Sequence, residues 1–329
     1  MNQRDDGSLR VLWRSRVGVE EATAEPAPDG VDLRVAPETP RDDLGDAQVL
    51  VDGDPPTWAL DLPSLERVVV PYAGIRPSLR EALRERPHLR LHNSHFNASF
   101  VAQHAVALLL ACAARLGRYD RALRSGDWRR GDGPTSLHLV GRRALLLGYG
   151  AIGQAAAPML QGLGLRVRAV RRRPDRAARD VPEHGADELP RLLAETDVVI
   201  ASLPATAATR GLIDAAAYAA LPAGAVVVNV GRGDVLDEDA TWEALEAGRL
   251  AGLGLDVWWR YPEDESARAA TLPSRRPFHL HPDVVLSPHR ANAVEDWQRA
   301  SVRDVFLTLD GIASGRDPDR NRVDVDRGY

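Results

Sequence analysis

Short apolar runs alternate with polar turns along the first hundred residues. Turns rich in proline and aspartate separate the runs, and residues 77–86 (PSLREALRER) carry a helical pattern of apolar positions. The apolar runs are VLWRSR, VDLRVA, AQVLVDG, LERVVVPYAG and LRLHN. Strands of this length that alternate with helical segments predict a small α/β unit.

A second alternating region follows a long helical pattern. Residues 97–124 keep a helical period, which predicts one long helix connecting two domains. Residues 144–153 (ALLLGYGAIG) then predict a buried strand, a glycine turn and a helix start, and further apolar runs are LRVRAV, DVVIASLP, AVVVNVG, LAGLGLDV and DVVLSPH. Continuous apolar strands between helices are typical of a parallel sheet covered on both faces. A last helix is predicted over residues 295–315, and we expect the charged tail after it to be loose.

The composition narrows the possible partners and chemistry. At 329 residues the chain exceeds the length of about 250–300 residues at which single cores stop growing, so we expect two domains. The net charge of −5 gives no general attraction to nucleic acid or to a membrane, and we expect neither as a partner. All 42 basic residues are arginine, which excludes a Schiff-base lysine and a GxxxxGK[ST] phosphate loop. We expect no bound metal.

The single cysteine and the N-terminal segment bear on the compartment. Cys112 lies in the apolar run AVALLLACAARL, where we expect a buried, inert thiol. One cysteine excludes a disulfide framework within the chain. The apolar run is too short to span a bilayer, and residues 1–10 are charged where a signal peptide needs an apolar segment. We therefore expect a cytoplasmic protein.

Three glycines between a strand and a helix match the G-x-G-x-x-G pattern. Gly148 permits a tight turn, Gly150 lets the backbone approach a pyrophosphate, and Gly153 allows the helix to pack closely. Ala151 and Ile152 begin the helix, whose N–H groups and dipole favour an anion. The pattern predicts a dinucleotide site, and a plain strand-to-helix turn is the alternative.

Three arginines stand where a dinucleotide fold of the commoner kind has an acidic residue for the ribose. They are Arg171, Arg172 and Arg173, at the end of the second strand. A carboxylate there would repel a 2′-phosphate, whereas guanidinium groups pair with it through charge-assisted hydrogen bonds. We therefore expect NADPH to be preferred, with NAD possible; a solvated basic turn is the alternative.

Five motifs follow one another in a fixed order between about residues 68 and 312. They are NASFVAQHAVALLL, LLGYGAIGQ, ASLPATAATRGLID, VVVNVGRGDVLDEDATWEALEAGRLAGLGLDV and VVLSPHRA. Together they resemble the D-2-hydroxyacid dehydrogenase family, which includes phosphoglycerate, glyoxylate/hydroxypyruvate and formate dehydrogenases. The resemblance implies an α/β fold of two Rossmann-like domains: a doubly wound nucleotide domain, residues 99–291, inserted into a smaller flavodoxin-like substrate domain, residues 1–98 plus 292–329.

The resemblance also implies site residues in the nucleotide domain. The N-x-x-R-G sequence selects Arg232, whose planar fork can hold a 2-oxo acid's carboxylate and polarise its carbonyl. The Pro-His pair selects His289, which can donate a proton to the carbonyl oxygen as hydride arrives. Further cofactor contacts are implied at Leu203, Pro204, Thr209, Val230, Gly231, Asp256 and His289.

One position departs from the family pattern. Family members usually carry a glutamate just before a proline here, and that glutamate raises the pKa of the histidine; this chain has Tyr261 before Pro262. A phenol is neutral at pH 7 but can hydrogen-bond an imidazole. We expect Tyr261 in the site, with a shifted loop that returns one of the acids at 263–265 as the alternative. Without a carboxylate partner, His289 should titrate at lower pH.

The loops of the first domain supply the remaining predicted substrate contacts. VVVPYAGIRP resembles the family loop that binds the substrate carboxylate, and it selects Tyr72, Ala73 and Gly74. Arg76 and His95 lie in the same loop and the next one, where each could meet a second anionic group or be an ordinary surface residue.

These observations favour an oxidoreductase that reduces a 2-oxo acid to a D-2-hydroxy acid with NADPH, in a homodimer. A reductase of a phosphonate- or phosphate-bearing 2-oxo acid is the alternative within the family. A nucleotide-sensing, corepressor-like binding protein without turnover is the alternative from another class.

Overall fold

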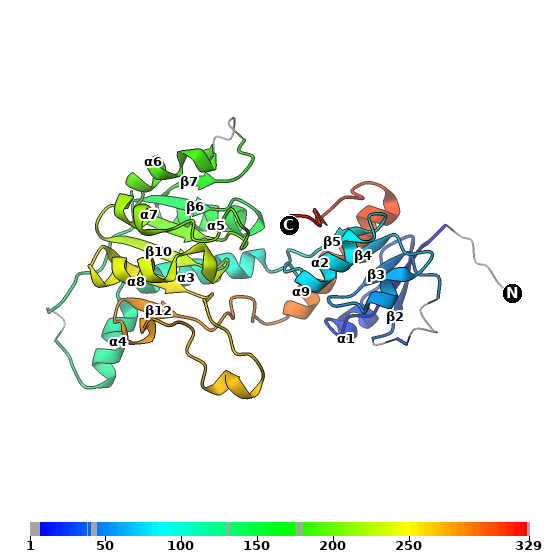
Figure 1. The fold of residues 1–329 in the computed structure, drawn as a ribbon, viewed down its shortest axis with the longest axis horizontal. Helices are drawn as coiled ribbons and strands as arrows, with labels where there is room; N and C mark the ends of the chain where they lie inside the picture. The colour runs from blue at the N-terminus through cyan, green and yellow to red at the C-terminus, as the bar shows by residue number, and fades with distance from the viewer. Residues whose placement is uncertain are drawn as a thin grey trace. The chain divides into compact units, whose positions relative to one another are not determined.

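The computed structural model describes residues 7–37, 39–40, 45–129, 132–175, 177 and 180–327. The chain divides into two compact units, Met1–Asn97 with Val294–Tyr329, and Ala98–Ala293 (Figure 1). The predicted domain boundaries were 98/99 and 291/292. Residues 1–6, which carried part of the signal-peptide argument, lie outside the described residues.

The first unit, called unit 1, is built on a six-stranded sheet in the order β13-β5-β4-β3-β1-β2. Strands β1 to β5 are parallel and β13 runs antiparallel to β5. Its strands and helices are β1 (Leu9–Trp13), α1 (Val19–Ala24), β2 (Val31–Val35), β3 (Val49–Val51), a 3-10 helix (Thr57–Asp61), β4 (Arg67–Val69), α2 (Pro77–Arg84), β5 (Arg90–His92), α9 (Trp297–Ser314) and β13 (Arg322–Val323). The parallel strands have the flavodoxin-like order 2-1-3-4-5.

The sheet of unit 1 is covered on both faces. Leu12, Leu50 and Leu83 belong to the core on one face, and Trp13 and Val305 to the core on the other, where α9 packs. Both faces are apolar because parallel strands are buried on each side.

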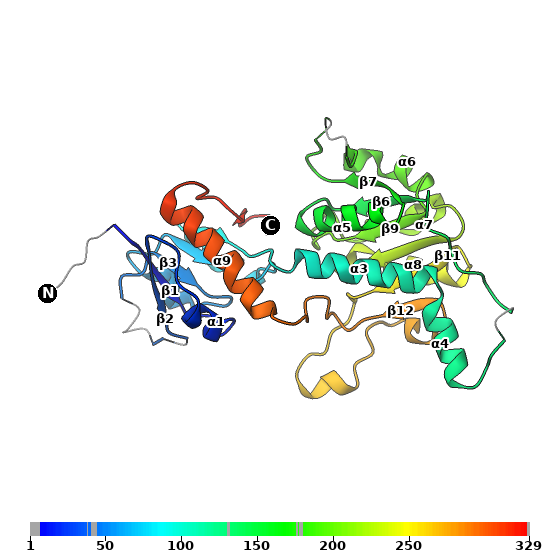
Figure 2. The same cartoon turned by 180° about the vertical axis from the view of Figure 1, so that it is seen from behind.

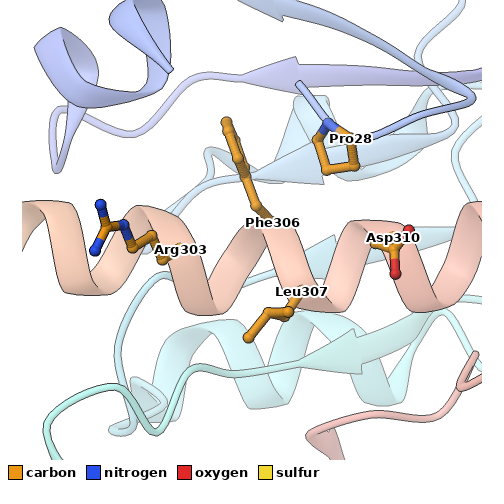
Figure 3. Close-up of a pocket in the computed structure, with 5 residues that line it drawn as sticks. All are labelled: Pro28, Arg303, Phe306, Leu307 and Asp310. Atoms are coloured by element: carbon orange, nitrogen blue, oxygen red, sulfur yellow. The ribbon is translucent and has the colours of Figure 1, made fainter. Parts of the chain in front are cut away.

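A cavity of about 420 Å³ lies on α9 of unit 1 (Figure 3). Its lining is Pro28, Arg303, Phe306, Leu307 and Asp310, and Phe306 extends from the helix toward the side on which Pro28 lies. The lining contains none of the predicted site residues.

The second unit, called unit 2, has a seven-stranded, wholly parallel sheet in the order β12-β11-β10-β9-β6-β7-β8. Its elements are α3 (Ala98–Ala113), α4 (Leu116–Arg124), β6 (Arg143–Leu147), α5 (Ala151–Gly162), β7 (Arg166–Val170), β8 (Glu183–His184), a 3-10 helix (Ala186–Glu188), α6 (Leu189–Ala194), β9 (Val198–Ala201), α7 (Ala215–Ala220), β10 (Ala225–Asn229), a 3-10 helix (Gly233–Val235), α8 (Glu238–Glu246), β11 (Leu250–Leu255), 3-10 helices (Ser266–Ala269, Phe278–Leu280) and β12 (Val284–Leu286). Numbered within the unit, the strands run 3-2-1-4-5-6-7, the order of a dinucleotide-binding fold.

Helices cover both faces of this sheet. Residues of α3 and α5, such as Leu109 and Leu160, pack on one face (Figure 2), and residues of α6, α7 and α8, such as Leu192, Tyr218 and Leu245, pack on the other. Each strand of this sheet except β8 therefore contributes side chains to both cores. This explains the continuous apolar runs in the sequence.

Two secondary-structure predictions are corrected by the structure. The single helix expected over 97–124 is two helices, α3 and α4, bent by 64°. Arg115 breaks the helix with a left-handed backbone (φ 58°), and its Nη1 lies 3.0 Å from Asp283 Oδ1. The tail expected to be loose contains β13, which pairs with β5 at Val323 and Leu91.

Among the described residues, no single helix has the length and apolar character to cross a membrane, although the bent pair α3 and α4 passes the same test when taken together. Cys112 of α3 is buried, as its apolar surroundings predict, and burial raises the pKa of its thiol to about 12.

Candidate active site

The glycine turn joins β6 to α5 at the carboxyl end of the sheet of unit 2. Gly148 has a φ of 99°, in the left-handed region that favours glycine. A Cβ on Gly153 would lie 2.3 Å from the carbonyl oxygen of Gly148, so only glycine lets α5 begin this close to the turn. A Cβ on Gly150 would meet nothing within 4 Å. This open space beside the positive end of a 12-residue helix fits a pyrophosphate.

The loops after β9 and β10 meet beside the glycine turn. A Cβ on Gly231 would lie 2.5 Å from the carbonyl oxygen of Leu203, and one on Gly148 would lie 3.1 Å from the Leu203 side chain. Thr209 closes the first loop by donating its hydroxyl to the Pro204 carbonyl. Strands β6 and β9 are neighbours where the strand order reverses, which is where open α/β sheets bind ligands. Most of the predicted cofactor contacts thus lie at the carboxyl ends of the parallel strands.

The arginine turn follows the carboxyl end of β7. Arg171 is half-exposed, and Arg172 and Arg173 are exposed. The backbone N–H of Arg171 donates to the His184 carbonyl at 3.0 Å, and Arg171 Nη1 lies 3.5 Å from Glu183 Oε1. The turn is therefore tied to β8, a strand that the sequence did not reveal.

Arg232 follows β10 in a turn held by Asn229. The Asn229 side chain accepts the Gly231 N–H at 3.0 Å and donates to the Arg232 carbonyl at 2.9 Å. A Cβ on Gly233 would lie 2.2 Å from the Trp258 carbonyl oxygen, so glycine lets this turn pack against the segment after β11. The Arg232 side chain is exposed.

His289 and Tyr261 are hydrogen-bonded to each other. The Tyr261 hydroxyl lies 3.0 Å from His289 Nδ1 and accepts the Trp258 N–H at 3.2 Å. Partial desolvation by the surrounding protein lowers the pKa of His289; the Arg232 charge lowers it further and the Asp256 charge opposes the change. Desolvation raises the pKa of Tyr261, which keeps the phenol neutral. Tyr261 and His289 are thus in contact, and Arg232 is near enough for its charge to act on both.

Asp256 fixes the backbone that presents His289. Asp256 is 1% exposed, and its carboxylate accepts the N–H groups of Arg290 (3.0 Å) and Ala291 (3.2 Å) and the Ser287 hydroxyl. His289 itself has a φ of 53°, a left-handed conformation that costs a non-glycine residue roughly 1–2 kcal/mol. The hydrogen bonds on either side of His289 offset that cost.

His104 of α3 lies behind this carboxylate. Its Nε2 is 3.0 Å from the Ser287 hydroxyl and 3.4 Å from Asp256 Oδ1. Through Ser287 and Asp256, helix α3 is therefore linked to the turn that carries His289.

Two of the three acids after Tyr261 have other partners. Asp264 accepts the Ser266 hydroxyl at 2.6 Å and Glu265 pairs with Arg268 at 2.9 Å. Tyr261 is the residue of this segment that contacts His289 among the described residues. Trp258 and Trp259 pack against the core of unit 2.

The predicted substrate loops of unit 1 lie side by side. Asn93 donates its amide to the Ala73 carbonyl at 2.9 Å, and the Ser94 N–H donates to the Tyr72 carbonyl at 3.4 Å. The His95 N–H donates to Asp304 of α9 at 2.9 Å. These contacts join the Tyr72–Ala73–Gly74 loop to the His95 loop. Arg76 is paired with Asp54 at 2.7 Å on the surface of unit 1.

Sequence reasoning missed four residues that support these sites: Asn93, His104, Glu183 and Ser287. His104 and Ser287 lie inside two of the five motifs, but the sequence does not show what their side chains contact. Asn93 is buried and its Oδ1 has no partner among the described residues. No sequence signal marked Glu183.

Known proteins resemble this chain in sequence and in fold. The model of the D-isomer specific 2-hydroxyacid dehydrogenase NAD-binding domain matches residues 106–291. A glyoxylate/hydroxypyruvate reductase B of Pectobacterium atrosepticum is 33% identical over 242 residues, which cover 70% of this chain and 72% of that protein. A glyoxylate reductase of Pyrococcus furiosus is 33% identical over 225 residues, 66% of this chain and 63% of that protein.

Two solved structures share the fold. A D-isomer specific 2-hydroxyacid dehydrogenase of Xanthobacter autotrophicus, in complex with NADPH and MES, is 26% identical with a TM-score of 0.76 and covers 98% of this chain and 100% of its own. An NADPH-dependent glyoxylate/hydroxypyruvate reductase of Sinorhizobium meliloti, in complex with NADP and malonate, is 28% identical with a TM-score of 0.66 and covers 93% of each chain. The chain therefore belongs to the D-isomer specific 2-hydroxyacid dehydrogenase family and is an NAD(P)-dependent oxidoreductase with two Rossmann-like domains.

Proposed function

We propose that this protein reduces a 2-oxo acid to a D-2-hydroxy acid with NADPH, and that His289 donates the proton. The observation that carries the proposal is the pairing of His289 with Tyr261, close enough to Arg232 for its charge to act on both. NADPH, when bound, supplies the hydride.

The side chains of unit 2 divide the remaining work. Arg232 binds the substrate carboxylate and polarises the carbonyl, since a guanidinium offers several N–H donors in one plane. Because Nδ1 of His289 faces the Tyr261 hydroxyl, Nε2 is the nitrogen left to transfer a proton to the carbonyl oxygen. Tyr261 orients the imidazole without adding charge, and Asp256 holds the turn. Addition of hydride and one proton balances the reduction.

The loops of unit 1 are proposed to bind the substrate carboxylate, with Tyr72, Ala73 and Gly74 as contacts and His95 beside them. Asn93 supports this proposal because it fixes the Ala73 carbonyl and so sets the direction of the loop. Arg76 contributes little to a second anion site while Asp54 neutralises it. Glyoxylate and hydroxypyruvate, the compounds in the names of two relatives, are therefore the first substrates to test.

The decisive experiment follows NADPH absorbance at 340 nm with a panel of 2-oxo acids that includes glyoxylate, hydroxypyruvate and a phosphorylated member. We expect turnover of at least one acid and a product of D configuration at C2. If NADPH binds and no 2-oxo acid is reduced, the enzyme proposal fails, and cofactor-dependent binding of another molecule becomes the better explanation.

The preference for NADPH rests on the arginine turn. Arg171 directly follows β7, half-exposed, with two exposed arginines after it. Arg171→Asp should weaken NADPH binding about 100-fold and NADH binding much less, because one charge-assisted hydrogen bond to a phosphate contributes roughly 1.5–3 kcal/mol. Fluorescence titration of both nucleotides measures this. Equal losses would remove the 2′-phosphate argument.

We also propose a homodimer formed through unit 2. Leu116 and Leu123 of α4 are exposed, and Trp128, just after it, is 79% exposed. Large apolar side chains gathered on one segment are typical of an interface. Light scattering should give twice the chain mass, and Trp128→Ser should shift the equilibrium toward the monomer. A monomer at all concentrations would contradict the proposal.

A further inference from the structure

Glu183 is a carboxylate on β8, directly beside the arginine turn. The register pairs Glu183 with Ala169 of β7, two residues before Arg171. It is 8% exposed and lies on a strand that the sequence did not predict. A buried carboxylate needs partners, because burying an unpaired charge is costly.

Among the described residues, Glu183 contacts both ends of the segment 171–175, which contains the arginine turn. Its Oε2 accepts the backbone N–H of Asp175 at 2.7 Å, and its Oε1 lies 3.5 Å from Arg171 Nη1. The backbone of Arg171 is tied to the next residue of β8, His184, at 3.0 Å. One carboxylate thus fastens both ends of the segment 171–175 to the edge strand.

The arginine turn and the glycine turn both follow the carboxyl ends of neighbouring strands, β7 and β6. Tyr149 stands between Gly148 and Gly150, and Glu183 and Arg171 both act on the pKa of its phenol, the first raising it and the second lowering it, beside the larger raising effect of burial. The segment that Glu183 shapes is therefore adjacent to the predicted pyrophosphate site.

We propose that Glu183 is the positioning residue that lets this protein discriminate NADPH from NADH. It holds Arg171 beside β8 through one nitrogen of the guanidinium, and the other N–H groups of that guanidinium bind the 2′-phosphate. Arg171 offsets the charge of Glu183, and Arg172 and Arg173 beside it keep the turn net positive toward a phosphate. The inference rests on the proposed NADPH preference and adds the residue that produces it.

The test measures nucleotide binding without turnover, so that it does not depend on the substrate. The Kd values of NADPH, NADH, 2′,5′-ADP and 5′-AMP are measured for the wild type, Glu183→Ala and Glu183→Gln. We expect Glu183→Ala to weaken NADPH and 2′,5′-ADP about tenfold, the scale of one charge-assisted contact, and to change NADH and 5′-AMP less than about twofold. Glu183→Gln should lie between, because its amide oxygen can still accept the Asp175 N–H.

Glu195→Ala is the matched control. Glu195 pairs with Arg168 of β7 at 2.7 Å, away from the arginine turn, so its removal should leave all four Kd values unchanged. Thermal unfolding of each variant checks that it is folded. If Glu183→Ala does not fold, the comparison of Kd values is made with Glu183→Gln.

Three results would overturn the inference: an equal loss for NADPH and NADH, unchanged binding, or tighter NADPH binding, which would make Glu183 a competitor of the phosphate. The wild type and Arg171→Ala together separate the two proposals. If the wild type binds NADPH no more tightly than NADH, the nucleotide proposal itself fails. If the wild type prefers NADPH and Arg171→Ala abolishes the preference while the Glu183 variants do not, only the role of Glu183 fails. If Arg171→Ala leaves the preference intact, the roles of both Arg171 and Glu183 fail.

Discussion

Two buried carboxylates, Asp256 and Glu183, support two side chains with proposed roles, His289 and Arg171, at the carboxyl ends of the strands of unit 2. Asp256, at the end of β11, binds the backbone around His289, and Glu183, on β8, binds both ends of the turn that carries Arg171. In both places the side chain with the proposed role is exposed or half-exposed. The carboxylate that holds it, which we call its anchor, is buried.

The difference between them lies in what each anchor holds. Asp256 stabilises a backbone conformation and is linked to α3 through His104 and Ser287, deep in the unit. Glu183 lies on a two-residue edge strand and contacts the guanidinium itself. We therefore expect changes near Asp256 to lower the rate with either nucleotide and changes near Glu183 to alter nucleotide choice alone. The following predictions test that separation.

The largest effect is expected at His289. His289→Gln should lower kcat for reduction by about 10³-fold, because general acid catalysis contributes roughly 10²–10⁴-fold. NADPH binding, measured by fluorescence titration, should change less than about twofold. His281→Gln, a change of another histidine of unit 2, is the control and should keep the rate. A strong loss of NADPH affinity in His289→Gln would show that the two sites are not separable.

A smaller effect is expected at Asp256. Asp256→Asn should lower kcat about 10- to 100-fold and the free energy of unfolding by about 1–3 kcal/mol, since an amide cannot accept all the hydrogen bonds of the carboxylate and leaves a buried N–H unsatisfied. Steady-state kinetics and urea denaturation measure the two quantities.

Asp197→Asn provides the comparison for that experiment. Asp197 pairs with Arg143 at 3.0 Å at the amino ends of β6 and β9, whereas the proposed reaction residues follow the carboxyl ends of strands. Its change should therefore cost stability without lowering kcat. Full activity in Asp256→Asn would show that the turn that carries His289 keeps its conformation without the carboxylate of Asp256.

The smallest effect is a shift in pH dependence at Tyr261. His289 must be protonated to donate in the reduction, and its pKa is lowered, so kcat/KM for reduction should fall as pH rises through a value below the ordinary pKa of histidine. Tyr261→Glu places a carboxylate near Nδ1 and stabilises the imidazolium, so the fall should move to higher pH.

Tyr261→Phe is the neutral control for that shift. It removes the hydrogen bond to His289 and the one that the hydroxyl accepts from the Trp258 N–H. Loss of the bond to His289, worth about 1 kcal/mol, should lower the rate about fivefold, while the profile does not move to higher pH. An unchanged profile in Tyr261→Glu would place the kinetically important ionisation on another group.

The sequence by itself predicted the parallel sheets and the glycine turn, and its resemblance to the family selected the proposed reaction residues. Apolar runs mark buried parallel strands, and the spacing of the glycines, which local backbone geometry sets, marks the turn at Gly148. Arg232 and His289 were selected by motifs that resemble those of the family. Tertiary structure decided the features that depend on distant partners. Arg115 breaks a helical pattern where it meets Asp283, and Val323 joins the sheet by pairing with Leu91.

The contacts of the two anchors, Glu183 and Asp256, also depend on partners that are distant in the chain. Nothing local distinguishes Glu183 from any surface glutamate, and only the pairing of β8 with β7 places its carboxylate against the arginine turn. His104 reaches Asp256 because α3 packs on the sheet of unit 2, far along the chain from β11. A side chain's neighbours along the chain are written in the sequence, whereas the burial and partners of a charged group are set by which strands and helices the fold brings together.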